Sequence, residues 1–512
     1  MLPSTILVRV SALLLSSVLA FATEPTPQTK RWWGHVQALS NDAMEGRDTG
    51  SPGYARAVQY VVRQFERVKL EPAGEKQYSQ TVPLREVRFR DDLATAELVG
   101  RTGVRKLRWL EELAVAANAA LPSQIDAPLV FIGSPDYARE VDIKGKIIVE
   151  LNPRQRVKDA KNPVFSQVPE GAVGIIGIDR LDSLEPPRWP QQYSVSVTLR
   201  EGPPVDSKIP TPLILRFNPE QAEVLFQGSG HSYKELREDE AQGKVSPSFD
   251  LPFLLRAKLV FETSEVASDN LLAMLPGTDP QLRDQVIVLS AHLDGYGFGS
   301  AWKGDRIYNG TFDDAAYVAT LIETAEKLRE TKTKLRRSVL FAVFTGEEKG
   351  LLGSRYFTRH LTIPRDRIVA NINLDQLRPL FPLKQLAMVG LEDSTLGETA
   401  RRIAEPMGLR IEPDREPWRN LIRRADNWNF MQIGVPAAGF VLAPETGTQD
   451  AEIYAEWYRL RYHTPLDDLK QPWDPGAAAK FHDFFLRLVE TLANSDERPE
   501  WNPRSQYAPK TH

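Results

Sequence analysis

Several residues that can bind metals follow directly after mostly apolar runs of the chain. These runs span residues 286–291, 340–344 and 368–374. The potential ligands at or after their ends are His292, Asp294, Glu347, Glu348 and Asp375. Short, mostly apolar runs are typical of strands in a parallel sheet, and ligands bind outside the carboxyl ends of such strands. We therefore expect these side chains to converge at one edge of a sheet, although they lie far apart in the sequence.

Two more places in the chain add potential ligands. Asp313 and Asp314 precede a predicted helix, and His463 lies in the string Tyr-His-Thr-Pro. Taken singly, each position has an ordinary structural explanation. An Asp before a helix usually caps it, a Glu pair usually lies on a solvated surface, and a buried His usually satisfies a hydrogen bond. Taken together, so many carboxylates would repel one another unless a cation lay between them.

A site with two metal ions is the simplest chemistry that accounts for this set. Zinc accepts histidine nitrogen and carboxylate oxygen as ligands. Water bound to such a site ionises near neutral pH, and a carboxylate that is not a ligand must then handle protons. The pair Glu347-Glu348 can supply that carboxylate. The residues therefore predict metal-assisted hydrolysis with a metal-bridging water and a Glu general base.

An alternation of strands and helices from Asn270 onward would position these residues. The predicted strands are 271–275, 286–291, 339–344, 368–374 and 436–441. The predicted helices are 314–328, 354–359, 394–407, 426–431 and 477–492. This order is typical of an α/β fold with a mixed, mostly parallel sheet flanked by helices. Another helix is predicted after Ser51-Pro52, because apolar residues recur at helical spacing as far as Val68.

The remainder of the chain suggests five parts. Residues 1–22 resemble a signal peptide, with an apolar run after Arg9 and the small-residue string Ala20-Phe21-Ala22. Residues 23–124, beginning with a polar lead, and 256–498 would form the catalytic unit. Residues 125–255, with short strands between turns rich in Pro, Gly and Asp, would form an inserted β-rich domain. Residues 499–512 would be a polar tail.

Composition and charge exclude several classes of protein. The chain has 512 residues, of which 42% are hydrophobic, so it is not mainly disordered. Lys and Arg number 64 and Asp and Glu 68, giving a net charge of −4, which argues against nucleic-acid binding. No cysteine is present, which excludes disulfides, thiolate nucleophiles and Cys-based metal sites. No apolar stretch is long enough for stable membrane insertion. We expect an exported protein, periplasmic or extracellular, of undetermined oligomeric state.

The ligand strings resemble those of a known family. His-x-Asp, Gly-x-x-Asp-x-Ala, Gly-Glu-Glu-x-Gly-Leu-Leu-Gly-Ser, Asn-x-Asp and Tyr-His-Thr-Pro-x-Asp occur here in that family's order. It is the co-catalytic di-zinc exopeptidase family of bacterial leucyl-type aminopeptidases and glutamate carboxypeptidase II. The strings at 42–47 and 71–74 are also similar to it, and the resemblance covers most of residues 36–495. The inserted part resembles a protease-associated domain, through less specific strings such as Lys144-Gly145-Lys146-Ile147.

The resemblance implies a role for each residue and two Zn²⁺ per chain. Asp313 would bridge both ions. His292 and Asp375 would complete one zinc site, and Glu348 and His463 the other. Glu347 would be the general acid and base, and Asp294 would orient a ligand histidine.

The resemblance also implies an activity, which is hydrolysis of peptide substrates at one end. The main expectation is an aminopeptidase, which removes N-terminal residues. A glutamate-carboxypeptidase-like activity is the main alternative, because Arg378, Arg419, Arg423 and Arg424 could grip a terminal carboxylate. A one-zinc, glutaminyl-cyclase-like acyltransferase and a non-catalytic receptor-like protein are further alternatives. Departures from the family's strings at Phe312, Asp314, Tyr317, 376–378 and 425–427 remove no ligand, but they leave the substrate preference open.

Overall fold

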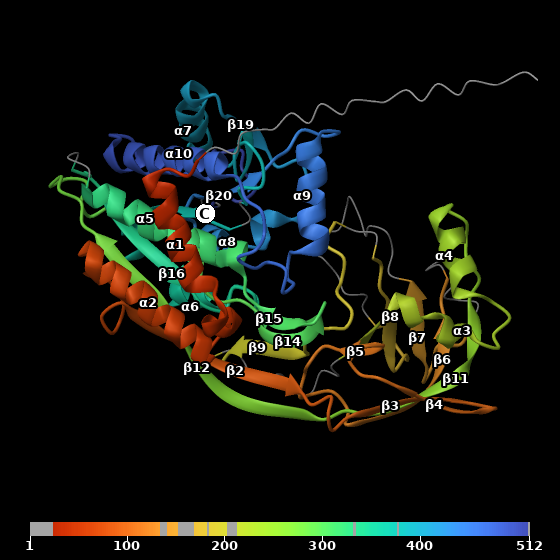
Figure 1. The fold of residues 1–512 in the computed structure, drawn as a ribbon. Helices are drawn as coiled ribbons and strands as arrows, with labels where there is room; N and C mark the ends of the chain where they lie inside the picture. Colours follow the sequence, from red (N-terminus) through yellow and green to blue (C-terminus); the bar gives the residue numbers. More distant parts are fainter. Residues whose placement is uncertain are drawn as a thin grey trace, which may run out of the picture.

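A computed structural model of the chain describes residues 24–133, 141–151, 168–181, 184–201, 212–330, 334–375 and 378–509. Within these residues the chain forms a large sheet flanked by helices and a smaller unit built on a second sheet (Figure 1). The predicted signal peptide at 1–22 lies outside the described residues. In the described part of the chain, no helix is both long and apolar enough to cross a membrane.

The large sheet has ten strands in the described residues, in the order β19-β18-β20-β17-β13-β16-β12-β2-β9, with β1 paired to β12. Its central strands are β20 (Ala437–Leu442), β17 (Ile368–Asn373), β13 (Val286–His292) and β16 (Ser338–Phe344). These four run parallel to one another. Further strands are β1 (Glu71–Pro72), β2 (Ser79–Phe89), β9 (Val195–Leu199), β12 (Phe261–Leu275), β18 (Gln385–Val389) and β19 (Arg410–Pro413). The α/β fold with a mixed sheet is thus confirmed, but its parallel pairing is confined mainly to the centre.

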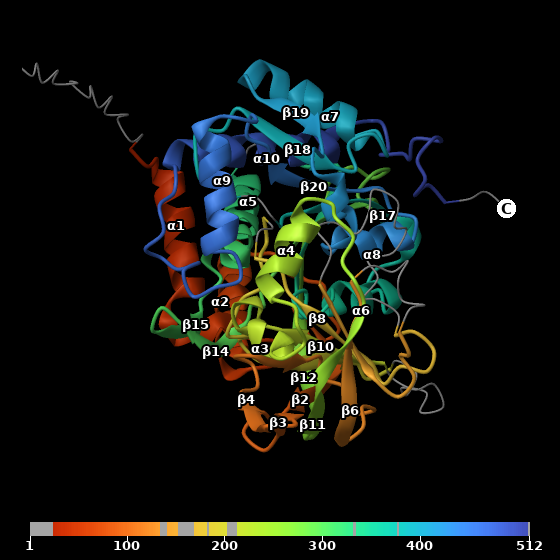
Figure 2. The ribbon, with the colours of Figure 1, turned by 90° about the vertical axis from the view of Figure 1, so that its right-hand side faces the viewer.

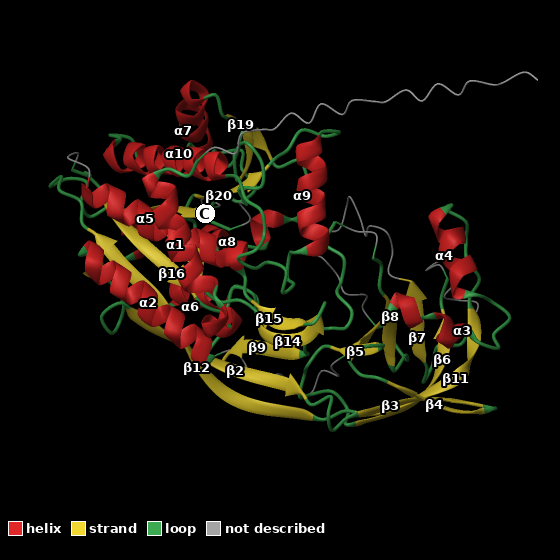
Figure 3. Cartoon of the chain, in the orientation of Figure 1, coloured by secondary structure: helices red, strands yellow, loops and turns green. Residues whose placement is uncertain are grey.

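Helices cover both faces of this sheet because its central strands are apolar on both sides (Figure 3). Alternate residues of β13 and β16, such as Leu289 and Phe341, pack toward helices α1, α2, α5, α7, α9 and α10. Their neighbours, such as Val288 and Leu340, pack toward α6 and α8. These helices are α1 (Pro27–Ser40), α2 (Pro52–Val68), α5 (Ala316–Glu330), α6 (Leu352–Arg359), α7 (Leu396–Ala404), α8 (Asn427–Gln432), α9 (Gln449–Leu460) and α10 (Pro475–Asn494).

The smaller unit is built on an eight-stranded sheet with the order β4-β3-β11-β6-β7-β8-β10-β5. Its strands are β3 (Thr95–Gly100), β4 (Gly103–Leu107), β5 (Leu113–Val115), β6 (Gln124–Phe131), β7 (Ile147–Leu151), β8 (Gly174–Ile178), β10 (Leu213–Phe217) and β11 (Phe249–Lys258). Helices α3 (Glu223–Phe226) and α4 (Tyr233–Ala241) complete it, and Figure 2 shows this unit facing the viewer.

The limits of the two units differ from those predicted. Strands β3 to β5 come before residue 125 and yet belong to the smaller sheet. Conversely, β9 lies between 125 and 255 but pairs with β2 at the edge of the large sheet. The chain therefore crosses between the units more often than one inserted segment would require, and a period-two pattern in a short strand does not indicate which sheet it joins.

The segments predicted as a polar lead and a polar tail both form defined contacts in the described chain. The polar lead expected at 23–30 includes the start of α1, where the Thr26 side chain accepts a hydrogen bond from the amide of Thr29 and Pro27 takes the first turn. The expected polar tail packs on the large unit, since Trp501 donates to the carbonyl of Gly434 at 2.9 Å.

Candidate metal centre

The site residues lie where parallel strands end at the same edge of the large sheet. His292 is the last residue of β13, and Glu347 and Glu348 lie in the turn after β16. Asp375 follows the end of β17 by two residues. Gly346 has φ +63°, a left-handed conformation that is favourable for glycine, so the chain can turn sharply between β16 and the two glutamates. The structure thus brings together the three strand-end groups that the sequence placed at one edge.

Asp313 lies between the two histidines. Its Oδ1 is 3.3 Å from Nε2 of His292, and its Oδ2 is 3.2 Å from Nε2 of His463. It belongs to the turn η4 (Thr311–Ala315) before α5, where the sequence predicted the start of a helix. The two oxygens of one carboxylate therefore face two different sets of ligands, which is the arrangement required of a bridging group.

Three groups of side chains have ligand atoms within 4.8 Å of one another at this edge. They are His292–Asp313–Asp375, Asp313–Glu348–His463 and His292–Glu347–Glu348. The first two groups match the two predicted zinc sites and share Asp313. The third shows that Glu347 is also close enough to be a ligand, so geometry alone does not separate its role from that of Glu348.

The chemistry of this site fits zinc. All of the donors are histidine nitrogens or carboxylate oxygens, which are zinc ligands. Within the described residues, Oδ2 of Asp313 and Oε1 of Glu348 are buried and have no hydrogen-bond partner. Buried polar atoms are normally paired, so carboxylate oxygens without hydrogen-bond partners in two residues of one ligand group indicate a place for a cation.

Asp314 differs from its neighbour Asp313. Its carboxylate accepts a hydrogen bond from the backbone amide of His292 at 3.2 Å, and it belongs to none of the three groups. Burial, together with the charges of Asp375 and Asp313, raises the pKa of Asp314 well above its usual value. This residue therefore supports the position of His292 through its backbone amide.

Asp294 lies beside His292, the ligand histidine that the resemblance implies it would orient. The His292 ring nitrogen Nδ1 lies 3.1 Å from the backbone carbonyl of Asp294 and 3.7 Å from its carboxylate. The carboxylate also accepts hydrogen bonds from the amides of Glu347 at 3.1 Å and Glu348 at 3.3 Å. Asp294 thus orients the histidine through its backbone, and its side chain fixes the turn that carries both glutamates.

Three further residues position the site and were not singled out from the sequence. Asp467 accepts hydrogen bonds from the amides of Phe312 and Asp313, at 3.0 and 3.1 Å. Arg47 is fully buried and donates to the carbonyls of Leu39, Leu293, Asn309 and Gly310. The Tyr296 hydroxyl lies 3.0 Å from Nδ1 of His463. Asp467 and Arg47 do lie in the strings that carry the resemblance, which was the available signal.

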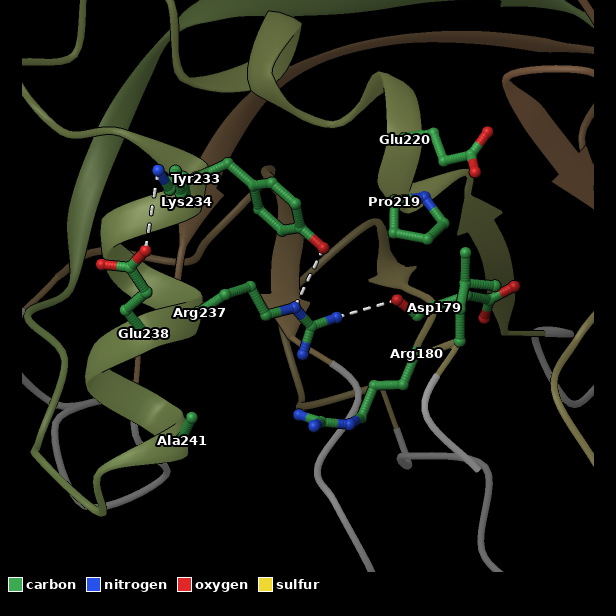
Figure 4. A pocket seen from close by; sticks show the side chains of 10 residues that line it. Asp179, Arg180, Pro219, Glu220, Tyr233, Lys234, Arg237, Glu238 and Ala241 are labelled. Carbon is green, nitrogen blue, oxygen red and sulfur yellow. Dashed lines mark hydrogen bonds and ion pairs between the residues drawn. The ribbon is translucent and has the colours of Figure 1, made fainter. Parts of the chain in front are cut away.

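A separate hollow of about 620 Å³ lies on the smaller unit and contains none of these residues (Figure 4). Tyr233 and Arg237 of α4 line it, and Arg237 donates to the Tyr233 hydroxyl at 2.9 Å. Arg237 also donates to the carbonyls of Ile178 and Asp179. The guanidinium therefore serves mainly to hold α4 against the sheet.

The fold and the site define a class, an α/β protein with a candidate zinc centre at the edge of its sheet. Residues 270–489, which include every candidate ligand, match the model of Peptidase family M28, and this similarity supports zinc as the metal. Leupeptin-inactivating enzyme 1 from Streptomyces exfoliatus is 26% identical over 217 residues, which is 41% of this chain. The match spans about half of that relative, 45% of its length.

Solved structures extend the similarity in fold to nearly the whole chain. An aminopeptidase from Aneurinibacillus sp. strain AM-1 superposes with a TM-score of 0.58 at 17% identity, covering 94% of this chain and 98% of that one. A zinc aminopeptidase from Bacillus subtilis gives a TM-score of 0.57 at 17% identity, with 94% and 97% covered. At such identities the likeness shows the fold alone, including the presence of both units.

Proposed function

We propose that the protein is an exported aminopeptidase that uses two zinc ions to hydrolyse the N-terminal peptide bond of its substrates. His292, Asp313 and Asp375 would hold one ion, and Asp313, Glu348 and His463 the other. The single observation that carries this proposal is the place of Asp313, whose two oxygens face His292 and His463 at 3.3 and 3.2 Å. Export rests on the signal-peptide-like sequence of residues 1–22.

The residues around the ligands provide the other parts of such a reaction. Bound zinc would polarise the scissile carbonyl and make water a better nucleophile near neutral pH. Glu347, 9% exposed, would accept a proton from the attacking water and pass it to the leaving amine. Asp294 holds the Glu347 amide at 3.1 Å, so the base is fixed with respect to His292.

Two of the four arginines that could bind a terminal carboxylate are already paired with a glutamate in this structure, which supports aminopeptidase polarity. Arg419 and Arg424 both pair with Glu185, Arg424 at 2.9 Å. Arg378 is 1% exposed and lies over the ring of Trp457, with its Nη2 3.6 Å from Asp313 Oδ2. Arg423 lies over Trp428. Arg419 and Arg424 would need to exchange Glu185 for the substrate, whereas Nε and Nη2 of Arg378 have no hydrogen-bond partner among the described residues, so Arg378 is the arginine on which a carboxypeptidase would depend.

The polarity can be tested with three substrates. We expect Leu-p-nitroanilide to be cleaved much faster than its N-acetylated form and faster than an N-blocked dipeptide with C-terminal Glu. Faster turnover of the blocked dipeptide would replace the aminopeptidase proposal with the carboxypeptidase one, and both share the same metal centre. No turnover by protein that has bound two zinc ions would overturn both.

The role of Glu347 is tested separately, because its position alone also allows it to be a ligand. Glu347→Gln should retain both zinc ions while turnover falls by at least about 100-fold, the lower range for a general base. Zinc content is measured on the same sample as turnover. Loss of one zinc ion in the variant would instead identify Glu347 as a ligand.

A further inference from the structure

The segment 184–193, which leads into β9, contacts loops that surround the metal centre. Glu185 pairs with Arg419 and Arg424, and Leu184 packs on the core of the large unit. At its other end, Tyr193 accepts a hydrogen bond from Lys349, the residue after Glu348. This segment therefore contacts several loops that border the ligands, and its residues come from outside the Peptidase family M28 match.

Arg188 of this segment binds the end of α9. Its guanidinium donates to the carbonyl of Tyr458 at 2.9 Å, to that of Tyr462 at 3.1 Å, and to that of Arg459. The last carbonyls of a helix have no donors within the helix, and a cation is favourable there. The guanidinium carbon of Arg188 lies over the Trp302 ring, 5.7 Å from the centre of the ring, and this contact limits the positions that Arg188 can take.

The next residue after Tyr462 is the ligand His463, and its backbone is unusual. His463 has φ +55°, a left-handed conformation that is strained for a residue other than glycine and persists only when its surroundings enforce it. Arg188 binds the carbonyl of the peptide group that joins Tyr462 to His463. It thereby fixes the orientation of the peptide plane from which the His463 side chain starts.

We propose that Arg188 is a positioning residue for His463, so that the metal position formed by Asp313, Glu348 and His463 depends on a residue of the 184–193 segment. This inference rests on the proposed two-zinc site. The other position, formed by His292, Asp313 and Asp375, has no contact with Arg188 among the described hydrogen bonds and ion pairs. Loss of Arg188 should therefore weaken one metal position selectively.

The test is a titration of the metal-free protein with zinc in which binding is measured by calorimetry. Wild-type protein should bind two ions. In Arg188→Met the first ion should bind with wild-type affinity and the second at least about 10-fold more weakly, the range for residues that orient ligands. Arg188→Lys, which keeps one charged donor, should recover part of the second affinity. Arg256→Met is the matched control, because Arg256 is an exposed arginine on β11 of the smaller unit and should leave both ions unaffected.

Each outcome bears on the proposal. Two ions bound to Arg188→Met with wild-type affinities would overturn it, and so would an equal weakening of both ions in a variant with a wild-type circular dichroism spectrum. If Arg188→Met does not fold, the same criteria apply to Arg188→Lys. If the wild-type protein binds fewer than two zinc ions, the proposed function is overturned as well. If the wild-type protein binds two ions and Arg188→Met binds both with the same affinities, only the role of Arg188 is overturned.

Discussion

At the residue scale, the site depends on carboxylates that hold backbone amides as well as on those that face the metal positions. Asp467 is 2% exposed and binds the amides of Phe312 and Asp313. We expect Asp467→Ala to release this turn and to lower zinc affinity and turnover by about 10- to 100-fold. The measurement is zinc affinity together with kcat. The neighbour Asp468, which binds only the local Lys470 amide and side chain, provides the control Asp468→Ala. Equal zinc affinity in the two variants would contradict this role.

Residue types and spacing were sufficient to group the candidate ligands but not to describe how they are held. His292, Glu347 and Asp375 could be placed at one edge because strand ends meet there whatever the loops do. The contact of Asp294 with the Glu347 amide could not, since it depends on the path of the turn after β16. Arg188 could not be found at all, because it contacts the His463 loop from a distant part of the chain.

At the element scale, elements with a continuous apolar run or a regular apolar spacing were predictable, and short or less regular ones were less so. The predicted strand 286–291 corresponds to β13, and 477–492 corresponds to most of α10. Helix α9 was not predicted, and neither was the helix α1, although the Thr26 cap was present in its sequence. Short strands such as β18 and β19 depend on neighbours for their pairing, so their local sequence carries a weak signal.

Helix α10 carries a buried histidine that should make stability depend on pH. Burial lowers the pKa of His482 to about 3. Its Nε2 lies 3.2 Å from the Thr320 hydroxyl, and its ring packs against Trp32. Above pH 6.5, the His482 side chain is mostly neutral in both the folded and the unfolded chain. As the pH falls below 6.5, the unfolded chain binds a proton that the folded chain does not, so stability declines until the pH reaches the folded value.

Replacement of this histidine by phenylalanine should remove that decline. Between pH 7.5 and 5.5, wild-type protein should lose about 1.4 kcal/mol more unfolding free energy than His482→Phe. Thr320 keeps its hydrogen bond to the Ala316 carbonyl in the variant. Denaturant unfolding at the two pH values measures the difference, in which the titrations common to both proteins cancel. If the two proteins show parallel pH dependences, His482 takes up its proton over the same pH range in the folded and the unfolded chain.

At the scale of the whole molecule, the two units are joined by more than their connecting strands. Phe89 of β2 and Phe261 of β12 belong to the large sheet and also pack on the core of the smaller one. Lys349, beside the candidate ligands, pairs with Asp48 at 2.9 Å and contacts Tyr193 of the 184–193 segment. The metal centre therefore lies among loops drawn from the N-terminal part, the 184–193 segment and the central sheet. None of these contacts was visible in the sequence, because each joins residues that are far apart along the chain.

This position couples metal binding to the stability of the chain. Asp313, Asp314 and Asp375 are at most 7% exposed, and without cations their charges repel one another in a medium that screens them poorly. Zinc at 100 times its dissociation constant adds about 2.7 kcal/mol per site to the folded state, which for a chain of 512 residues corresponds to a rise in Tm of roughly 2–3 °C per ion. We expect a chelator to lower Tm by that amount and added zinc to restore it, as measured by differential scanning calorimetry. A variant with both His292 and His463 replaced by Ala should melt at the same temperature with and without zinc. If the variant still responds to zinc, the ion binds somewhere other than the edge of the large sheet.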